Sequence, residues 1–513
     1  MSAILRKLDS DIRNVRVSAD PSAEHTSSIH ARSGVAAGNI WSFVYSSIER
    51  KLQEKLVMLP RLARVIAGER ELQFTLQFIT HAISAFSAAC SGHGDVRDRD
   101  SVPARAASAA DPLDTQFFMD DTSRKRINAQ LEKQIPTLCG ALCEVALIDV
   151  ENTVRGGIGE LTIPVVGDRG VRPILLDAGV KTQAKSRPLH STTLPFQLRF
   201  QLLSQTESIQ CLSDLCQQLG NSQGARLAFG AWDVLFGQSI DGRSLPSPQA
   251  LYALLGVVAG VQQRLLLRPR KEPSSDQAAC LEFLRHVTTQ TSELLAARPS
   301  ISPMPTATGE ALSSMGQIMQ RALSAAMCVV LAGGSFVAYA SAISTATERL
   351  SVDEMLADLL FPLLEHLVRT SMLRLTLGIC TVLTAQRAYC CLQADSQLRF
   401  VAATAFEILD RIAVAMMAGT SDQTIGTDTP SGRVGALLVE NIDYLMDSLA
   451  FQLENVSEYP RAPDTLAALW SHAGTVRFCS LTVTYVSCSH ICVVVRVPGG
   501  PPPASRHCAR SAS

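Results

Sequence analysis

SVDEMLADLLFPLLEHLVR (351–369) is the first of three segments that decide the fold class; SQLRFVAATAFEILDRIAVAMMAG (396–419) and VGALLVENIDYLMDSLAFQLE (434–454) follow it. In each segment apolar residues recur every three or four positions, which predicts an amphipathic α-helix. The three stripes consist of Leu356, Leu359, Leu360, Leu363, Leu364 and Leu367; of Leu398, Val401, Ala402, Ala405, Ile408, Leu409, Ile412 and Met416; and of Leu438, Ile442, Leu445, Leu449 and Leu453.

Local signals indicate how these helices start and bend. Ser351 with Glu354 three residues later is a capping box, in which each side chain bonds a backbone N–H that the helix leaves unpaired. Pro362 is expected to kink or split the first helix. Glu407 and Arg411 are expected to form an i,i+4 ion pair on the outer face of the second helix.

Helical patterns of the same kind recur along most of the chain, in pairs with short breaks between them. Apolar residues make up 47% of the sequence and aromatic residues only 5%, so leucine and alanine must fill the core. This composition favours stacked helices over sheets. Because one helical pair can bury its stripe only against the next pair, we predict an all-α fold, an α-solenoid of HEAT/armadillo-like repeats.

Shifts in composition divide the chain into segments. Helical pairs are expected at the N-terminus, and the stretch SGHGDVRDRDSVPARAASAADP reads as a flexible linker. The expected segments are 1–90 (helical pairs), 91–112 (linker), 113–151 (helical), 152–193 (irregular loop or small hairpin), 194–298 (helical repeats), 299–309 (linker), 310–470 (helical repeats) and 471–513 (atypical tail).

The segment 152–193 interrupts the helical pattern because it is rich in Gly and Pro. Apolar residues alternate at 161–165, so a small hairpin and a plain loop are both compatible with it. Helices are expected to resume at Leu194. The clearest helix start is Ser247 as N-cap, with Pro248 at the first helical position.

The stretch from Ala322 to Thr347 carries no charged residue and is long enough to span a bilayer. It consists largely of Ala, Ser, Gly and Thr, with Gly333 and Gly334 in the middle. It also lacks the Trp belt and the Lys/Arg cluster that anchor membrane helices. We therefore expect a buried repeat helix followed by its turn, with a membrane span as the alternative.

The overall charge and the cysteines limit the compartment and the partners. The net charge of −1 provides no basic field for nucleic acid. The 14 cysteines are scattered, mostly on apolar helical faces, and the first residues, MSAILRKLDSDIRNVR, are unlike a secretory signal. We expect a reducing intracellular location, cytoplasmic or also nuclear, with neither nucleic acid nor membrane as a partner.

Residues that could carry chemistry do not form a recognisable site. Cys139 and Cys143 are four residues apart on one helix, but no second pair with zinc spacing accompanies them. The run at 156–159, Gly-Gly-Ile-Gly, lacks the Lys-Ser/Thr of a phosphate-binding loop. The tail holds a further possible chelating group, formed by Cys488, His490 and Cys492. With no catalytic motif present, we expect a protein that is not an enzyme and that uses no cofactor and no metal.

An acidic ridge is the one candidate partner-contact surface in the sequence. Glu440, Asp443, Asp447 and Glu454 fall on the polar side of the third helix. Such a ridge is more often only the solvated face of an amphipathic helix. Repeat solenoids nevertheless bind partners along extended surfaces, so contact with a partner is a reasonable hypothesis for these four residues.

The segments LLFPLLEHL, VAATAFEILDRIAVA and LLVENIDYLMDSLAFQLENVSEYPRAPDTLAAL together resemble the Tti-one family. The most specific part is Glu440 to Leu453, followed by Pro-Arg-Ala-Pro at 460–463. The chain departs from the family pattern in two places. A long insertion, 370–395, separates the first helix from the second, and the resemblance stops after Trp470.

The resemblance implies a non-enzymatic scaffold subunit of the TTT co-chaperone complex. Its implied partners are Tel-two-like and Tti-two-like proteins, the Hsp-ninety chaperone machinery and phosphatidylinositol 3-kinase-related kinases of the TOR, ATM and ATR types. Two alternatives remain open on the residues alone. One is another HEAT/armadillo adaptor, such as a transport-receptor-like scaffold, and the other is a membrane protein that uses 322–347.

The last residues, 471–513, differ in kind from the rest of the chain. They hold four cysteines, a Val-rich run and a Pro/Gly-rich end, and they do not continue the helical pattern. We expect this tail to be a non-native end, so that the chain would be a C-terminally truncated relative of the Tti-one family. The run from Ser480 to Val497 also has the composition of an aggregation-prone segment.

Overall fold

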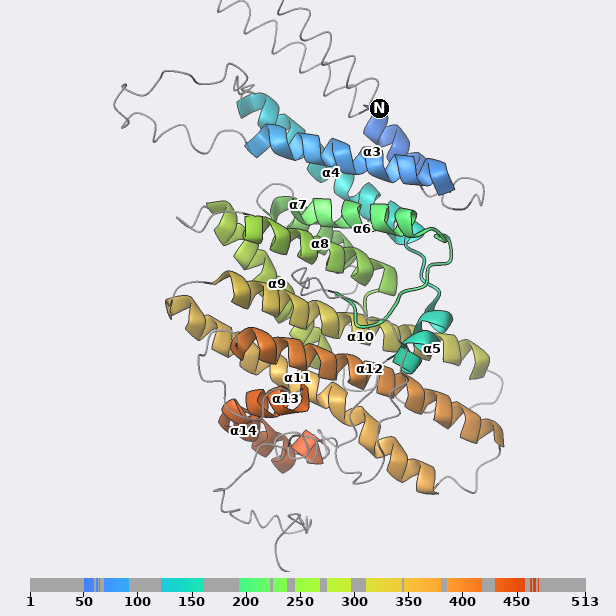
Figure 1. Ribbon diagram of the computed structural model, residues 1–513, viewed down its shortest axis with the longest axis vertical. Helices are drawn as coiled ribbons and strands as arrows, with labels where there is room; N and C mark the ends of the chain where they lie inside the picture. Colours follow the sequence, from blue (N-terminus) through green and yellow to red (C-terminus); the bar gives the residue numbers. More distant parts are fainter. Residues whose placement is uncertain are drawn as a thin grey trace, which may run out of the picture.

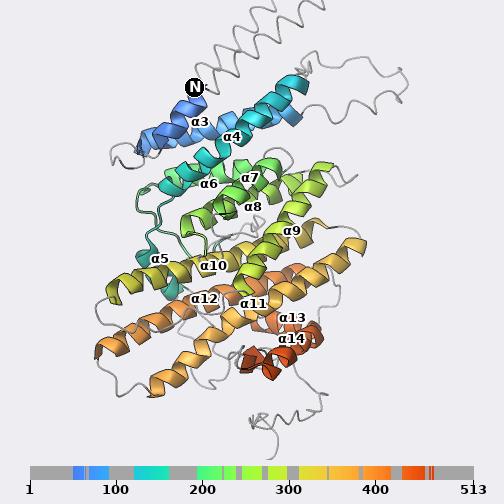
Figure 2. The same ribbon diagram turned by 180° about the vertical axis from the view of Figure 1, so that it is seen from behind.

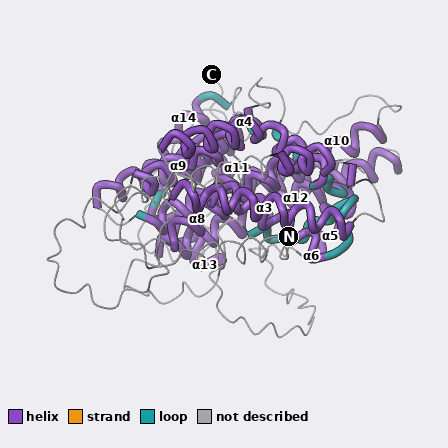
Figure 3. The backbone as a smooth tube through the Cα atoms, turned by 90° about the horizontal axis from the view of Figure 1, so that it is seen from above, coloured by secondary structure: helices purple, strands orange, loops and turns teal. Residues whose placement is uncertain are grey.

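The computed structural model describes most of 50–91, then 121–160, 193–221, 225–237, 245–267, 275–296, 311–343, 346–379, 385–417, 430–456 and a few positions between 462 and 469. Within these ranges the chain is helical, apart from short connections and one isolated bridge between Ile148 and Phe200. The view from above shows this helical content directly (Figure 3). The all-α prediction is confirmed.

The helices follow one another along the chain, with connections that differ widely in length. A first helix covers 50–59. The named helices are α3 (Glu69–Ser91), α4 (Asp121–Val145), α5 (Val150–Glu160), α6 (Thr206–Asn221), α7 (Arg226–Leu235), α8 (Pro248–Leu267), α9 (Ser275–Ala296), α10 (Ala311–Ala342), α11 (Ala346–Ile379), α12 (Ala385–Met417), α13 (Pro430–Glu440) and α14 (Ile442–Glu454).

Apart from α5, which lies beside α10 and α12, the helices stack in chain order along the long axis of the molecule (Figure 1). α3 and α4 lie at one end, α6 to α8 form the next layer, α9 to α12 follow, and α13 and α14 lie at the other end (Figure 1). The opposite view shows the same order (Figure 2). Each layer packs on the next: α3 on α6, α6 on α8, α8 on α10, α10 on α12 and α12 on α13. This is the neighbour-to-neighbour packing expected of stacked helical repeats.

The centre of the stack is α10, which packs against α5, α8, α9, α11 and α12. In its most apolar part, within Gly316–Ala342, 94% of the residues are buried inside the protein. Its hydroxyls are satisfied locally: Ser324 Oγ donates to Pro246 O at 2.9 Å, and Ser335 Oγ lies 2.8 Å from Thr288 Oγ1. The helix is therefore a core helix by its surroundings, as the expected buried repeat helix requires.

Glycines allow close contact between two pairs of helices, and in the pair α6 and α8 the backbones themselves touch. A Cβ atom built on Gly260 of α8 would lie 1.9 Å from the carbonyl oxygen of Gln217 in α6. A Cβ atom built on Gly220 of α6 would likewise lie 1.9 Å from the carbonyl oxygen of Val257 in α8. Between α10 and α12, a Cβ on Gly333 would meet Ile408 Cγ2 at 2.1 Å. Any larger side chain at these positions would force the helices apart.

The extended segment 193–205 departs from the prediction that helices resume at Leu194. Instead it pairs with the residues before α5: Asp149 N–H donates to Arg199 O at 2.7 Å, and Gln201 N–H donates to Leu147 O at 2.8 Å. α6 starts only at Thr206. Leucine spacing suggested a helix, but Pro195 and this backbone pairing keep the segment extended.

The Gly-rich start of the segment 152–193 is helical, which corrects the expectation of a loop or hairpin there. Residues 156–159 lie in the second half of α5. Tertiary packing outweighs the low helix propensity of glycine, because Gly157 lies where a Cβ would meet Phe400 of α12 at 2.5 Å. The alternating residues at 161–165 lie outside the described residues.

Around the family-like segments, the buried stripes agree with the prediction but the helix ends do not. The six leucines from Leu356 to Leu367 are all buried, and so are Val401 to Ile412 of the predicted second stripe. α11, however, starts at Ala346, so Ser351 lies inside the helix and is not an N-cap. α11 also continues through Pro362 without being split.

Two further boundaries differ from the prediction. The expected insertion 370–395 is largely helical. Residues 370–379 are the end of α11, and residues 385–395 are the start of α12. The expected single helix 434–454 breaks at Asn441, whose φ and ψ are −105° and 18°. Its side-chain amide donates to Leu437 O at 2.9 Å, so it competes with the backbone for the helical acceptor.

Other predictions are confirmed or stay predictions. Ser247 caps α8, because its Oγ accepts from the backbone N–H of Ala250 at 3.2 Å, and Pro248 is the first helical residue. The division of the chain into segments stays a prediction. The linker from 92 on and the tail after 470 lie outside the described residues.

We predict that Gly260→Ala lowers the free energy of unfolding by about 1–3 kcal/mol, the usual range for overpacking a tight contact. The added methyl group would meet the Gln217 backbone, which cannot move without shifting α6. Urea unfolding followed by circular dichroism measures this change. Gly316→Ala in α10 is the matched control, because its Cβ meets nothing within 4 Å. The free energy of unfolding of that variant should rise by about 0.5–1 kcal/mol. Equal changes in the two variants would contradict the close approach of α6 and α8.

Candidate interaction surface

The four predicted ridge residues lie at the α14 end of the stack. Glu440 ends α13, while Asp443, Asp447 and Glu454 lie on α14. All four are exposed. The opposite side of α14 buries Leu445 and Leu449, in a helix that packs against α11. The structure therefore places Asp443, Asp447 and Glu454 on the solvent side of α14 and Glu440 at the exposed end of α13, and contact of these four residues with a partner stays a prediction.

Two aromatic residues on α14 share this exposed surface, and sequence reasoning missed them. Tyr444 is 41% exposed and Phe451 is 59% exposed. They are seven residues apart, which places them on the same side of the helix. The available signal was their position outside the leucine stripe of α14, where a large apolar residue has no place in the core. We call Asp443, Tyr444, Asp447, Phe451 and Glu454 the α14 face.

Tyr444 connects the α14 face to exposed acidic residues of α11. Its hydroxyl donates to Asp358 Oδ1 at 3.2 Å. Partial burial, together with the charge of Asp358, raises the pKa of Tyr444. Tyr444 therefore stays protonated and remains a donor to Asp358 at neutral pH. Asp353, Glu354 and Asp358 are all exposed on α11, so the acidic surface continues from α14 onto α11.

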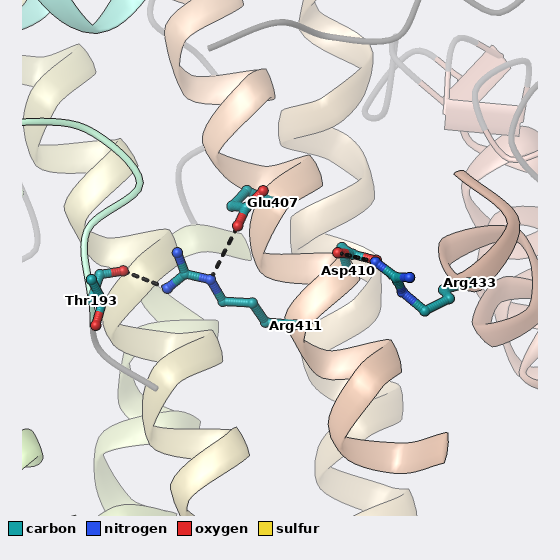
Figure 4. A network of polar contacts seen from close by, with 5 residues as sticks. All are labelled: Thr193, Glu407, Asp410, Arg411 and Arg433. Atoms are coloured by element: carbon teal, nitrogen blue, oxygen red, sulfur yellow. Dashed lines mark hydrogen bonds and ion pairs between the residues drawn. The ribbon is translucent and has the colours of Figure 1, made fainter. Parts of the chain in front are cut away.

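A polar network on α12 ties this end of the stack to the rest of the protein (Figure 4). Arg433 of α13 donates two hydrogen bonds of 2.8 Å to Asp410, from Nε to Oδ1 and from Nη2 to Oδ2. On the next position along α12, Arg411 donates from Nε to Glu407 at 3.4 Å and from Nη1 to Thr193 O. The predicted pair of Glu407 with Arg411 is confirmed, and Arg411 also holds the extended segment 193–205.

Of the two cysteines noted on α4, Cys139 is buried and Cys143 is half-buried. Burial raises the pKa of Cys139 to about 12 and that of Cys143 to about 11. Burial, together with these two neighbours, also raises the pKa of Cys216. Thiols with such values are protonated at neutral pH, and a protonated thiol is a poor nucleophile and a poor metal ligand. The described part of the chain has no group of three or more His, Cys, Asp or Glu placed to hold a metal ion. Cys488, His490 and Cys492 lie outside it.

One cavity of about 200 Å³ lies between α6 and α8. Its polar lining includes Ser213, Cys216, Gln217 and Tyr252. Two of these groups are hydrogen-bonded to each other, since Gln217 Nε2 donates to Ser213 Oγ at 3.2 Å. Burial raises the pKa of Tyr252, so its hydroxyl is neutral. The cavity therefore contains neither a charged group nor an activated nucleophile that would indicate catalysis.

Comparison with known families supports the resemblance noted in the sequence. The model of the family described as TELO2-interacting protein 1 matches residues 389–485. The resemblance to the Tti-one family is confirmed. No curated protein and no solved structure matches the chain.

The Tti-one match differs in extent from the resemblance read in the sequence. It starts inside α12, so the segment 351–369 lies outside it, and it continues 15 residues beyond Trp470 into the atypical tail. It contains the α14 face and the pairs Arg433–Asp410 and Arg411–Glu407. The Tti-one-like part of the chain is thus the part that carries the candidate surface.

We predict that Arg433→Leu lowers the free energy of unfolding by about 1–3 kcal/mol, because it leaves the Asp410 carboxylate without its charged partner. The Asp410 side chain is only 13% exposed, so water replaces the lost bonds poorly. Arg155→Leu is the control. It breaks an i,i+4 pair with Glu151 in which both side chains are 56% exposed, and it should cost less than about 1 kcal/mol. Chemical unfolding of both variants measures the difference, and equal losses would contradict an anchoring role for Arg433.

Proposed function

We propose that this chain is a non-enzymatic scaffold subunit of a TTT-type co-chaperone assembly. The observation that carries the proposal is the match of 389–485 to a family described as TELO2-interacting. The stacked helices support it, because repeat arrays present long surfaces on which several proteins can bind at once. The part of the chain that the structure describes shows no assembled group of catalytic side chains that would favour an enzyme instead.

The partners proposed for the chain are those that the family resemblance implies. A Tel-two-like protein is the first of these, because the matching family is described by that interaction. A Tti-two-like protein and the Hsp-ninety machinery complete the proposed assembly. Its proposed clients are phosphatidylinositol 3-kinase-related kinases of the TOR, ATM and ATR types, and its proposed location is the cytoplasm and the nucleus.

The proposed mechanism is surface complementarity, without bond making or breaking. A stack of helical layers holds its exposed faces in a fixed arrangement, since each layer is packed on its neighbours. A scaffold of this kind raises the local concentration of one bound partner near another. The chain would thereby bring a kinase client and a chaperone together.

Two alternative functions make different predictions. A transport-receptor-like or other repeat adaptor would share the helical stack but would not copurify with Tel-two-like proteins. A membrane protein would have to expose α10 to lipid, which is opposed by the 94% burial of its most apolar window.

We predict that the full chain, tagged at its own locus, copurifies with a Tel-two-like protein and with kinases of the proposed class. Depletion of the chain should lower the steady-state level of those kinases over several days, because the assembly is proposed to stabilise newly made kinase. Quantitative mass spectrometry measures both, with an unrelated protein kinase as control. Recovery of neither the Tel-two-like protein nor any such kinase would contradict the proposal.

A further inference from the structure

The α14 face combines negative charge with exposed aromatic surface. Asp443, Asp447 and Glu454 supply three carboxylates within 12 residues, and Tyr444 and Phe451 lie among them. Large apolar side chains exposed singly need no explanation. Here, however, two of them share one short helix, in the part of the chain that matches the family model.

Within α13 and α14 the structure describes a single cationic side chain, and it is bound to a residue outside this face. The sequence of α14 contains no Lys or Arg. The single arginine of α13, Arg433, has its guanidinium bound to Asp410 on the other side. Asp358 of α11 adds an exposed carboxylate next to the face, because the Tyr444–Asp358 hydrogen bond joins the two helices.

We propose that the α14 face is the docking site for a basic amphipathic segment of a partner protein. Lysines or arginines of that segment would pair with Asp443, Asp447 and Glu454, and its apolar side would cover Tyr444 and Phe451. Aromatic residues with a rim of charge are the composition of a binding hot spot. The inference rests on the proposed scaffold function and identifies the surface and the chemistry of one partner contact.

The charge pattern disfavours most of the competing occupants. A second copy of the chain on a two-fold axis would bring the same carboxylates face to face, which is unfavourable. Nucleic acid and anionic membrane are repelled by an acidic surface. The remaining competitor is the chain itself, because residues 471–513 contain Arg477, Arg496, Arg506 and Arg510 and no acidic residue. The experiments below distinguish that case.

The first experiment identifies what covers the face. A photo-crosslinking phenylalanine analogue replaces Ala450, which is exposed beside Phe451, in the otherwise intact full-length chain in cells. The expected result is a cross-link to a peptide of another protein in the complex that has net positive charge and an apolar side. A cross-link only to residues 471–513, to a second copy or to an acidic peptide would overturn the proposal, and so would the absence of any cross-link.

The second experiment tests the charges. The variant D443K/D447K reverses two carboxylates of the α14 face. D233K/E282K is the matched control, with the same change in net charge on exposed residues of α7 and α9. Binding of the cross-linked partner to the full chain is measured at low and at physiological salt. We expect the first variant to weaken binding by about tenfold or more and to reduce its salt dependence, and the control to bind like the wild type.

The outcomes separate this inference from the proposed function. If the wild-type chain copurifies with its Tel-two-like protein and kinases while D443K/D447K binds like the control, the inference is wrong and the scaffold function stands. If the wild-type chain copurifies with none of them, the scaffold function itself is wrong. Phe451→Ala should weaken the same interaction without changing its salt dependence, because it removes contact area and no charge. An unchanged affinity for that variant would also overturn the proposal.

Discussion

The removal of α10 from water is the constraint on which the described structure depends. A helix of this length without charge on its central turns is unfavourable in solvent, and it becomes stable only when other helices cover it on all sides. α8, α9, α11, α12 and α5 do so. The buried serine hydroxyls Ser324 and Ser335 of α10 are tolerated because each finds an acceptor, as Ser335 does in Leu331 O at 2.7 Å. The two halves of the stack meet at this helix.

Close approach of helix backbones then determines how the layers fit. Gly220 and Gly260 allow α6 and α8 to touch, and Gly333 seats Ile408 of α12 against α10. Such contacts replace large side chains by backbone packing, which agrees with the low aromatic content of 5%. The aromatic residues that are present gather at junctions, for example Phe196 and Phe400, whose ring centroids lie 4.7 Å apart. Glycines therefore set the distance between packed helices, and an aromatic pair fixes the segment 193–205 on α12.

The sequence predicted the buried stripes well, because burial follows the helical period and the period is local information. Leu359, Leu409 and Leu445 are buried for that reason. Helix ends were predicted less well, since they depend on contacts distant in the sequence. Ser351 had a capping pattern but lies inside α11, and residues 193–205 had helical spacing but are extended, because they pair with 147–149. The acidic members of the α14 face were visible in the sequence. Tyr444 and Phe451 could be placed outside the leucine stripe, but a pattern does not show which side chains neighbouring helices leave uncovered.

The extended segment 193–205 also has a consequence for the synthesis of the chain. Thr193 is held by Arg411, which is 218 residues further along the chain, and Phe196 packs on Phe400. A ribosome adds about 5–20 residues per second, so these partners emerge roughly 10 to 40 s later than the segment that needs them. During that interval the N-terminal layers can stack on one another, but the Phe196 ring and the Thr193 carbonyl are without their final contacts. The segment 193–205 would then be fixed only when α12 arrives, which joins the later part of the chain to a segment made long before it.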